Sequence, residues 1–325
     1  MIKNFFSHVP DLNQKTILIT GGTGSFGVIF LKSIIERFSP KKLIIFSRDE
    51  LKQYELAIQF PEKKYPFIRY FIGDVRDYNR LEMAFRDVDV VVHAAALKHV
   101  SIAEYNPYEC IHTNVIGAEN IVRAALRNQV KKVIALSTDK AVNPINLYGA
   151  SKLAAEKIFI AANNIRGSDP TIFSVVRYGN VIGSRGSVLP LFRKLIQEGA
   201  KSLPITDPRM TRFWITLPQS VDFVLSSISM MQGGEIFIPK IPSMKIIDIA
   251  QWFSNELDTH TIGIRPGDES SQTIELSDRY IIEPFCEGPY KSNEQNPRVK
   301  KGYIYSSETN SEWIEQNQFQ EWLNE

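Results

Sequence analysis

The stretch TILITGGTGSFG, residues 16–27, decides the fold of this chain. Its first five residues are typical of a buried strand, and a helical pattern follows over residues 26–38. Between them, glycines stand at positions 21, 24 and 27. Glycine permits a tight turn and lets backbone N–H groups approach a pyrophosphate, which the N-terminus of the helix then stabilises. The stretch therefore predicts a dinucleotide-binding turn, with a plain glycine turn as the alternative.

Further short apolar runs alternate with helical patterns along the first half of the chain. Continuous β-branched runs suit strands that are buried on both faces, and their alternation with helices indicates right-handed βαβ crossovers in a parallel sheet. We therefore predict an α/β fold with a doubly wound parallel sheet. The expected strands are residues 16–20, 42–47, 68–73, 88–96, 131–137 and 171–179, and the expected helices include residues 26–38, 78–86, 107–128 and 147–164.

The pattern loosens after about residue 182. A short helix, a second helical stretch at QSVDFVLSSISMM and a strand at GEIFIPK follow among turn signals. We predict a nucleotide-binding domain over residues 1–182 and a smaller substrate-binding lobe over residues 183–325. Some segments of the second part are expected to return and pack on the first.

Composition and charge narrow the class of protein. The chain has 325 residues, 43% of them hydrophobic and 23% charged, as in an ordinary globular protein. A net charge of +2 is too small to argue for nucleic acid binding. Cys110 and Cys286 form neither a CxxC motif nor a disulfide or zinc framework, and no long apolar run suggests a membrane span. We expect a cytoplasmic protein without a metal site and without membrane insertion.

The end of the second expected strand bears on the choice of cofactor. An NAD-binding fold of this kind places a carboxylate there for the ribose 2′-hydroxyl, whereas this chain has Ser47 and then Arg48. A cation at this place suits the 2′-phosphate of NADP. Asp49 and Glu50 follow directly, so an exposed charged loop is the alternative.

A second group of reactive residues follows the fifth expected strand. The strand runs into Thr138, Asp139 and Lys140, and Tyr148 and Lys152 come next on an expected helix. A spacing of four puts Tyr148 and Lys152 on one helical face, where the ammonium lowers the pKa of the phenol and helps it act as a base. A tyrosine and a lysine often stand four apart by chance, so this pattern is informative only together with the glycine turn.

The pair Asp139 and Lys140 points to a particular reaction. An oxidoreductase or epimerase that uses a bound dinucleotide needs only a hydroxyl, the tyrosine and the lysine, because it moves only a hydride and one proton. An internal dehydration also needs a base for a carbon acid and an acid for the departing hydroxide. Asp139 and Lys140 supply candidates for both, while a surface ion pair at a strand end is the alternative.

Several stretches of the chain resemble one family closely. They are ILITGGTGSFG, FSRDELKQYE, FIGDVRD, HAAALKHV, STDKAVNPINLYGASKL, FSVVRYGNVIGSRGSV, ITDPRMTRFWIT and GGEIFIPKIPSMK, spread over roughly residues 15–266. Together they look like the C5-inverting UDP-N-acetylglucosamine 4,6-dehydratases, which start pseudaminic acid synthesis in bacteria. That family belongs to the extended short-chain dehydrogenase/reductase superfamily, which has a Rossmann fold.

The resemblance implies a dehydration in which NADP is recycled. Tyr148 would take the proton of the sugar C4 hydroxyl while a hydride passes to NADP, Lys140 would remove the C5 proton, and Asp139 would protonate the leaving C6 hydroxyl. Hydride return at C6 and a proton on the opposite face of C5 would give a 4-keto-6-deoxy sugar of the L-arabino configuration, whereas retaining relatives keep the D-xylo one. Thr138 would hydrogen-bond the C4 oxygen, and Lys152 the nicotinamide ribose.

The resemblance also assigns binding residues. Lys98 and Asn180 would contact the substrate, a UDP-sugar. Arg212 and Arg265 would bind its diphosphate, although either could instead be a solvated charge. The cofactor would be held by Gly21, Thr23, Gly24, Ser25, Phe26, Gly27, Ser47, Arg48, Asp49, Lys52, Asp74, Val75, Ala94, Ala95, Ala96, Lys98, Asn114, Tyr148, Lys152 and Val181.

One segment departs from the family pattern. Relatives usually continue the RPG turn with Glu-Lys-x-His-Glu, whereas this chain has Asp268, Glu269, Ser270, Ser271 and Gln272. The identity of the UDP-sugar therefore stays open. Two alternatives remain: a related NADP-dependent epimerase or dehydratase for capsule or lipopolysaccharide sugars, and a catalytically silent NADP-binding scaffold, which would predict a broken catalytic set. The resemblance also implies a homo-oligomer.

Overall fold

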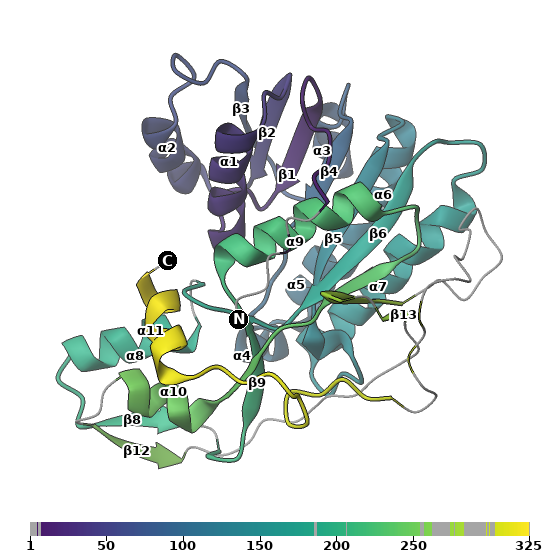
Figure 1. Cartoon of the computed structure of the whole chain (residues 1–325). Helices are drawn as coiled ribbons and strands as arrows, with labels where there is room; N and C mark the ends of the chain where they lie inside the picture. The colour runs from purple at the N-terminus through teal and green to yellow at the C-terminus, as the bar shows by residue number, and fades with distance from the viewer. Residues whose placement is uncertain are drawn as a thin grey trace.

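Among the described residues, nine strands form one twisted sheet in the computed structural model (Figure 1). The structure describes residues 5, 8–184, 187–205, 207–253, 257–261, 274–275, 277–282, 297, 299 and 303–324. In order across the sheet, the strands are β13 (Ile274–Glu275), β14 (Arg279–Ile282), β10 (Ile236–Pro239), β6 (Ile172–Tyr178), β5 (Lys132–Thr138), β4 (Val90–His93), β1 (Thr16–Thr20), β2 (Lys42–Ser47) and β3 (Ile68–Ile72).

The strands from β10 to β3 in this order all run parallel, and β14 pairs with β10 in the antiparallel direction. The order β3, β2, β1, β4, β5, β6 is that of doubly wound nucleotide-binding folds. Strand β1 is buried along its whole length. Its Ile17 and Ile19 join the core on one face and Leu18 the core on the other, because successive side chains alternate along a strand. The predicted doubly wound α/β fold is confirmed.

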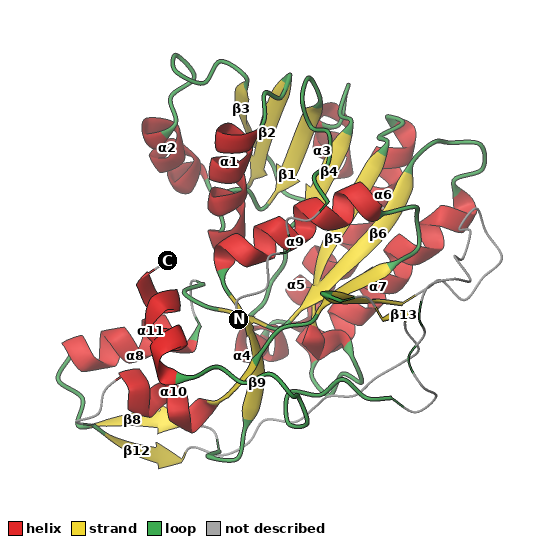
Figure 2. Cartoon of the chain, viewed as in Figure 1, coloured by secondary structure: helices red, strands yellow, loops and turns green. Residues whose placement is uncertain are grey.

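Helices cover both faces of this sheet (Figures 1 and 2). On one face, α1 (Ser25–Arg37) and α9 (Leu217–Met230) pack together, and Phe30 and Phe223 join the same core. On the other face, α3 (Tyr78–Ala84), α6 (Gly117–Arg127) and α7 (Leu147–Ile165) bury Leu81, Ile121 and Phe159 in a second core. The sheet is thus packed between two layers of helices, each with its own apolar core.

The boundaries of some elements differ from the prediction. Residues 107–128 were expected as one helix but form α5 (Pro107–Ile111), a π-helical turn (His112–Ile116) and α6. A π-helical turn fits one more residue into the helix than an α-helical turn does. Strand β4 ends at His93 because residues 94–96 leave the sheet at its carboxyl edge. Helices α2 (Glu50–Gln59) and α4 (Val100–Tyr105) are further helices that the sequence analysis did not name.

Residues after 182 are divided between the large sheet and a smaller lobe with its own core. In the lobe, α8 (Val188–Gln197), α10 (Ile246–Phe253) and α11 (Gln316–Asn324) bury Phe192, Ile249 and Phe319 (Figure 1). By contrast, α9, β10, β13 and β14 pack on or join the large sheet. Two short sheets complete the lobe. One consists of β9 (Thr211–Ile215), β11 (Ser243–Lys245) and β7 (Asn180–Val181), which comes just before residue 182, and the other of β8 (Ser202–Ile205) and β12 (Asp258–Thr261).

A buried ion pair joins α7 to β6. Arg177 Nε and Nη2 donate to the two carboxylate oxygens of Glu156 at 3.1 and 2.5 Å. Replacing Arg177 by methionine would leave the Glu156 carboxylate buried without its partner, and we expect the free energy of unfolding to fall by about 3–5 kcal/mol. Urea unfolding followed by circular dichroism measures this. Replacing both residues by methionine should recover much of the loss, and a loss below about 1 kcal/mol in the single variant would contradict the argument.

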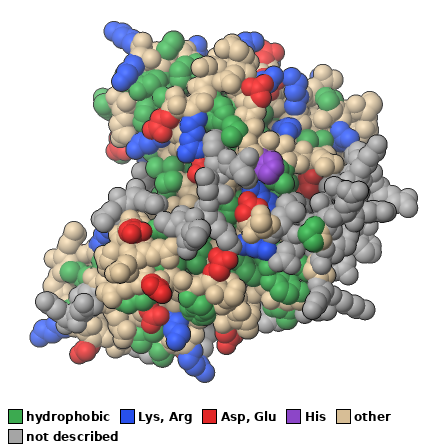
Figure 3. All heavy atoms as spheres, viewed as in Figure 1, with side chains coloured by type: hydrophobic (Ala, Val, Ile, Leu, Met, Phe, Trp, Pro, Cys, Tyr) green, Lys and Arg blue, Asp and Glu red, His purple; other side chains and the backbone are tan. Residues whose placement is uncertain are grey.

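The surface carries mixed charge. On the face drawn in Figure 3, acidic and basic side chains of the described residues are interspersed, as a net charge of +2 leads one to expect. In the part of the chain that the structure describes, no helix combines the length and the apolar character that crossing a bilayer requires.

Candidate active site

A cavity of about 700 Å³ lies at the carboxyl ends of the parallel strands. The segments that follow β1, β2, β3, β4, β5 and β6 all contribute to its wall. In doubly wound sheets, ligands bind at this edge, where the strand order reverses. Of the predicted site residues that the structure describes, all line this cavity except Asn114, Asp139 and Arg212.

The glycine turn brings the start of α1 close to the end of the sheet. Gly21 has a φ of 66°, in the left-handed region that favours glycine. A Cβ added at Gly27 would lie 2.4 Å from the carbonyl oxygen of Gly22, so only glycine allows α1 to approach the turn this closely. Ser25, the first residue of α1, lines the cavity. Backbone N–H groups at such a helix start can bind an anion there.

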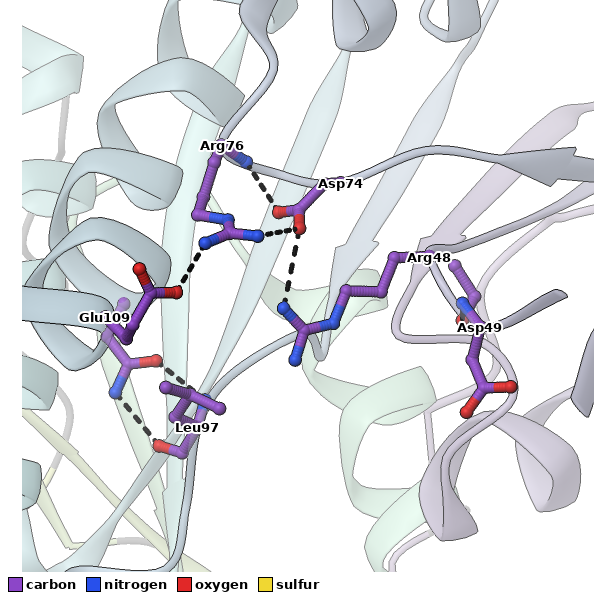
Figure 4. Close-up of polar contacts among 8 residues, drawn as sticks. Arg48, Asp49, Asp74, Arg76, Leu97 and Glu109 are labelled. Atoms are coloured by element: carbon purple, nitrogen blue, oxygen red, sulfur yellow. Dashed lines mark hydrogen bonds and ion pairs between the residues drawn. The ribbon is translucent and has the colours of Figure 1, made fainter. Parts of the chain in front are cut away.

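At the end of β2, Arg48 and Asp49 point in different directions (Figure 4). The Asp49 carboxylate accepts a hydrogen bond from the Lys52 backbone N–H at 3.0 Å, as the N-cap of α2, and also pairs with the Lys52 ammonium. Arg48 extends toward Asp74, and its side chain is 55% exposed. Asp49 therefore acts as a helix cap, whereas Arg48 presents a cation at the cavity wall.

Tyr148 and Lys152 lie one helical turn apart near the start of α7, and both line the cavity. The Lys152 ammonium donates a hydrogen bond to the carbonyl oxygen of Leu136 at 2.7 Å, near the end of β5. Burial lowers the pKa of Lys152 to about 8, although the charge of Glu156 acts in the opposite direction. The lysine is thus fixed beside the tyrosine, and it loses its charge as the pH rises through about 8.

Burial raises the pKa of Tyr148 above its ordinary value, although a hydrogen bond with Thr138 acts in the opposite direction. The charge of Asp139 raises the pKa of the phenol further. The phenol is therefore protonated in this structure. Additional positive charge in the cavity would be needed for it to act as a base near neutral pH.

Thr138, Asp139 and Lys140 form one hydrogen-bonded group. Thr138 Oγ1 and Lys140 Nζ both donate to Asp139 Oδ1, each at 2.9 Å. Lys140 Nζ also donates to Asn180 Oδ1 at 3.3 Å. Burial alone would raise the pKa of Asp139. The charge of Lys140 and the hydrogen bonds that Asp139 accepts from Lys140 and Thr138 outweigh burial and lower the pKa. The resting pair is therefore a carboxylate and an ammonium, with Lys140 on the cavity side.

Asn114, expected at the cofactor, lies behind the cavity wall and is buried. Its amide oxygen accepts from the Leu97 N–H at 2.9 Å, and its amide nitrogen donates to the Leu97 carbonyl at 3.0 Å and to Ser151 Oγ at 2.9 Å. Asn114 belongs to the π-helical turn. It therefore fixes the loop that carries Lys98 against α7.

Arg212, expected at the substrate diphosphate, lies on β9 outside the cavity wall. Its Nη1 donates to the carbonyl oxygen of Thr211 at 2.7 Å. Its charge contributes to the lowered pKa of Asp139. The predicted Arg265 and the segment 268–272 fall outside the described residues.

The sequence analysis missed several residues of the cavity wall. Thr113 and Ser137 are buried, and their hydroxyls have no hydrogen-bond partner among the residues that the structure describes. Tyr178 pairs with Thr138 across neighbouring strands and also lines the wall. Its place at the carboxyl end of a strand could have identified it, whereas Thr113 comes from the π-helical turn, which leaves no pattern in the sequence. Unsatisfied hydroxyls in a cavity wall suit a polar ligand.

Comparison with known proteins places the chain in a family. The family model described as polysaccharide biosynthesis protein matches residues 17–281. A UDP-N-acetylglucosamine 4,6-dehydratase (inverting) of Campylobacter jejuni is 56% identical, over 96% of this chain and 98% of that protein. A UDP-glucose 4-epimerase of Rickettsia bellii is 47% identical, over 82% of this chain and 79% of that protein.

A solved structure has the same fold over nearly the whole chain. The X-ray structure of Pen from Bacillus thuringiensis shares 37% identity with this chain and has a TM-score of 0.87, covering 95% of this chain and 97% of Pen. The resemblance that the sequence motifs show over roughly residues 15–266 is thus confirmed, and the Campylobacter protein extends it to 96% of the chain. The chain belongs to the polysaccharide biosynthesis protein family, within the group of the inverting UDP-N-acetylglucosamine 4,6-dehydratases.

Proposed function

We propose that this chain dehydrates UDP-N-acetylglucosamine with inversion at C5, forming UDP-2-acetamido-2,6-dideoxy-β-L-arabino-hexos-4-ulose. The main support for the proposal is that two groups of reactive residues lie at one cavity. One group is Tyr148 and Lys152, and the other is the hydrogen-bonded group of Thr138, Asp139 and Lys140. An internal dehydration needs both a base for the hydroxyl and an acid–base pair for the elimination. The 56% identity to the Campylobacter enzyme supports the same substrate.

The residues present fit a nicotinamide dinucleotide. The glycine turn and the N-terminus of α1 form a site for its pyrophosphate, and the unpartnered hydroxyls of Thr113 and Ser137 offer hydrogen bonds deeper in the cavity. Asp74 and Val75 at the end of β3 would hold the adenine. When bound, the nicotinamide would supply reversible hydride transfer, from C4 of the sugar and back to C6.

The choice of NADP over NAD rests on Arg48. Its cation lies at the cavity wall while Asp49 is engaged as a helix cap. Arg48→Ala should weaken NADP binding by about 10- to 100-fold and NAD binding by less than about threefold, because only NADP carries the 2′-phosphate that the guanidinium would pair with. Calorimetric titration of both cofactors measures this. Equal weakening of the two would contradict the proposed preference.

In the proposed first step, Tyr148 removes the proton of the C4 hydroxyl. The protonated Lys152 stabilises the phenolate, since the two side chains share one face of α7. Thr138, which donates to Asp139 in this structure, turns its hydroxyl to the C4 oxygen. Lys98 and Asn180 from the cavity wall hold the sugar. The family resemblance assigns the diphosphate to Arg212, which lies on β9 outside that wall, and to Arg265. The ketone formed at C4 makes the C5 hydrogen acidic.

In the proposed elimination, one proton is exchanged between Lys140 and Asp139. The pair rests as an ammonium and a carboxylate, so a proton first passes from Lys140 to Asp139 along their 2.9 Å hydrogen bond. The neutral amine of Lys140 then takes the C5 proton, and Asp139 gives its proton to the C6 hydroxyl, which leaves as water. The pair is then an ammonium and a carboxylate again, so the elimination step is balanced in protons.

Proton NMR of the purified protein with UDP-N-acetylglucosamine in D₂O tests the proposed function. We expect a new C6 methyl signal with the couplings of the L-arabino configuration. A C4 epimer without a methyl signal would instead support an epimerase, as the 47% identity to the Rickettsia protein allows. Cofactor binding without turnover of this or other UDP-sugars would support the scaffold alternative.

We further propose that the protein is a cytoplasmic homo-oligomer whose product enters pseudaminic acid synthesis, as the family resemblance implies. The exposed apolar side chains of Ile102, Tyr105 and Tyr108 on α4 and α5 support an interface on that face. Light scattering of the purified protein measures its molar mass, and a monomer would contradict the oligomer.

A further inference from the structure

Arg76 lies just outside the cavity wall and forms an ion pair with Asp74, whose carboxylate belongs to that wall (Figure 4). The Arg76 backbone N–H donates to Asp74 Oδ1 at 3.0 Å, and Arg76 Nη2 donates to Asp74 Oδ2 at 2.7 Å. The other terminal nitrogen, Nη1, donates to Glu109 Oε2 on α5 at 2.5 Å. The Arg76 guanidinium therefore bridges a carboxylate of the cavity wall and a carboxylate of a neighbouring helix.

Arg48 shares the same Asp74 oxygen but binds it more loosely. The distance from Arg48 Nη1 to Asp74 Oδ2 is 3.5 Å, longer than a normal charge-assisted hydrogen bond. Burial would raise the pKa of Asp74, but the hydrogen bonds and charge of Arg76 outweigh it and lower the pKa, with a smaller contribution from Arg48. Asp74 is thus held mainly by Arg76, at 2.7 Å against 3.5 Å for Arg48, and Arg48 stays available to the cavity.

We propose that Arg76 is a positioning residue for the preference for NADP over NAD. By binding Asp74, it prevents Asp74 from forming a full ion pair with Arg48. This inference rests on the proposed use of NADP. Without Arg76, the Asp74 carboxylate would pair fully with Arg48. The 2′-phosphate would then have to compete with Asp74 for the guanidinium. NAD has no 2′-phosphate, so its binding depends much less on Arg48.

Glu109 has the supporting role in this arrangement. Its carboxylate holds the Nη1 side of Arg76, which leaves the Nη2 side directed at Asp74 (Figure 4). The Glu109 side chain is 49% exposed, so its contact is weaker than a buried pair would be. Glu109→Gln should therefore lower the ratio of NAD to NADP dissociation constants by only about two- to threefold.

Calorimetric titration of wild-type protein and variants with NADP and with NAD tests the proposal. Arg76→Gln should raise the Kd for NADP about tenfold or more and the Kd for NAD less than about threefold. Arg76→Lys keeps the positive charge and should retain most of the preference. Arg86→Gln, which removes an exposed arginine that lies outside the cavity wall, is the matched control and should leave both constants unchanged.

A double variant identifies the competing group. Asp74→Asn added to Arg76→Gln removes the carboxylate that would capture Arg48. The ratio of the two dissociation constants should return to within about threefold of that in Asp74→Asn alone. Comparison with the single Asp74→Asn variant matters because Asp74 would also contact the adenine that both cofactors share.

The outcomes separate this inference from the proposed function. Wild-type protein that binds NAD as tightly as NADP would overturn the cofactor choice and the inference with it. A wild-type preference that survives in Arg76→Gln, or equal weakening of both cofactors, would overturn only the role of Arg76. A preference that stays lost in the double variant would show that Asp74 is not the competitor. If Arg76→Gln fails to fold, Arg76→Lys and Glu109→Gln still test the ratio.

Discussion

Tyr148→Phe should lower kcat for the dehydration of UDP-N-acetylglucosamine by about 10³-fold or more, while the Kd for NADP stays within about threefold. The substitution removes a single oxygen and keeps the ring in the cavity wall. Without the phenol, the C4 hydroxyl keeps its proton, no ketone forms and the C5 hydrogen stays unreactive. The rate of methyl formation by NMR and calorimetric titration of NADP measure the two quantities.

Tyr178→Phe is the matched control for this prediction. Tyr178 lines the same cavity, pairs with Thr138 across β5 and β6, and also has its pKa raised by burial. Because it lies on a strand and has no lysine one helical turn away, its loss should lower kcat less than about tenfold. Equal losses in the two variants, or more than a tenth of the activity left in Tyr148→Phe, would contradict the role of Tyr148.

The parallel strands could be predicted from the sequence because burial on both faces leaves a continuous apolar run. KLIIFS at residues 42–47 and the run at 131–137 show this plainly, and the structure has β2 and β5 at nearly these positions. The contribution of β10, β13 and β14 to the same sheet could not be predicted. Their pairing depends on segments far apart in the sequence, and nothing local to GEIFIPK specifies β6 as its neighbour.

Asp49, at the start of helix α2, was interpreted as a charge near the cofactor and not as a helix cap. An aspartate just before ELKQYELAIQ is, however, also a helix N-cap. The π-helical turn at His112–Ile116 was hidden for a different reason. Apolar residues recur along 107–128 closely enough to a helical period that one extra residue does not break the pattern.

In the candidate site too, the positions of residues next to predicted strands could be predicted, whereas contacts between distant segments could not. Thr138 and Lys140 could be placed at the cavity because they follow a predicted strand. The ionic state of Asp139 and the contact of Lys140 with Asn180 could not, since the two segments meet only when β5 and β6 pair. The Arg76 pair with Glu109 joins residues that lie far apart in the sequence, and no spacing rule connects them.

Lys140→Gln should abolish the removal of the C5 proton, with a loss of about 10³-fold or more in overall turnover. Lys140 is the member of the pair that lines the cavity, whereas Asp139 lies behind it. Glutamine can replace the hydrogen bond to Asn180 but cannot accept a proton at neutral pH. Overall turnover alone cannot separate this defect from the Tyr148 defect, so a partial reaction is needed.

The C5-epimeric ketone of D-xylo configuration provides that partial reaction. It already carries the C4 ketone, so Tyr148 is no longer needed, and its C5 hydrogen lies on the same face as in UDP-N-acetylglucosamine. Incubated in D₂O, it should exchange that hydrogen in wild-type protein and in Tyr148→Phe, seen as collapse of the methyl doublet in the proton NMR spectrum. Lys140→Gln should exchange at least about 100-fold more slowly.

Asp139→Asn decides which member of the pair acts at C5. The pair rests as a carboxylate and an ammonium, so Lys140 can act as the base only after its proton has moved along the 2.9 Å hydrogen bond. Asparagine cannot take that proton, so exchange should slow but persist as Lys140 loses its proton to solvent instead. Exchange that vanishes in Asp139→Asn and survives in Lys140→Gln would reverse the two roles, with the carboxylate as the base and the ammonium as the acid.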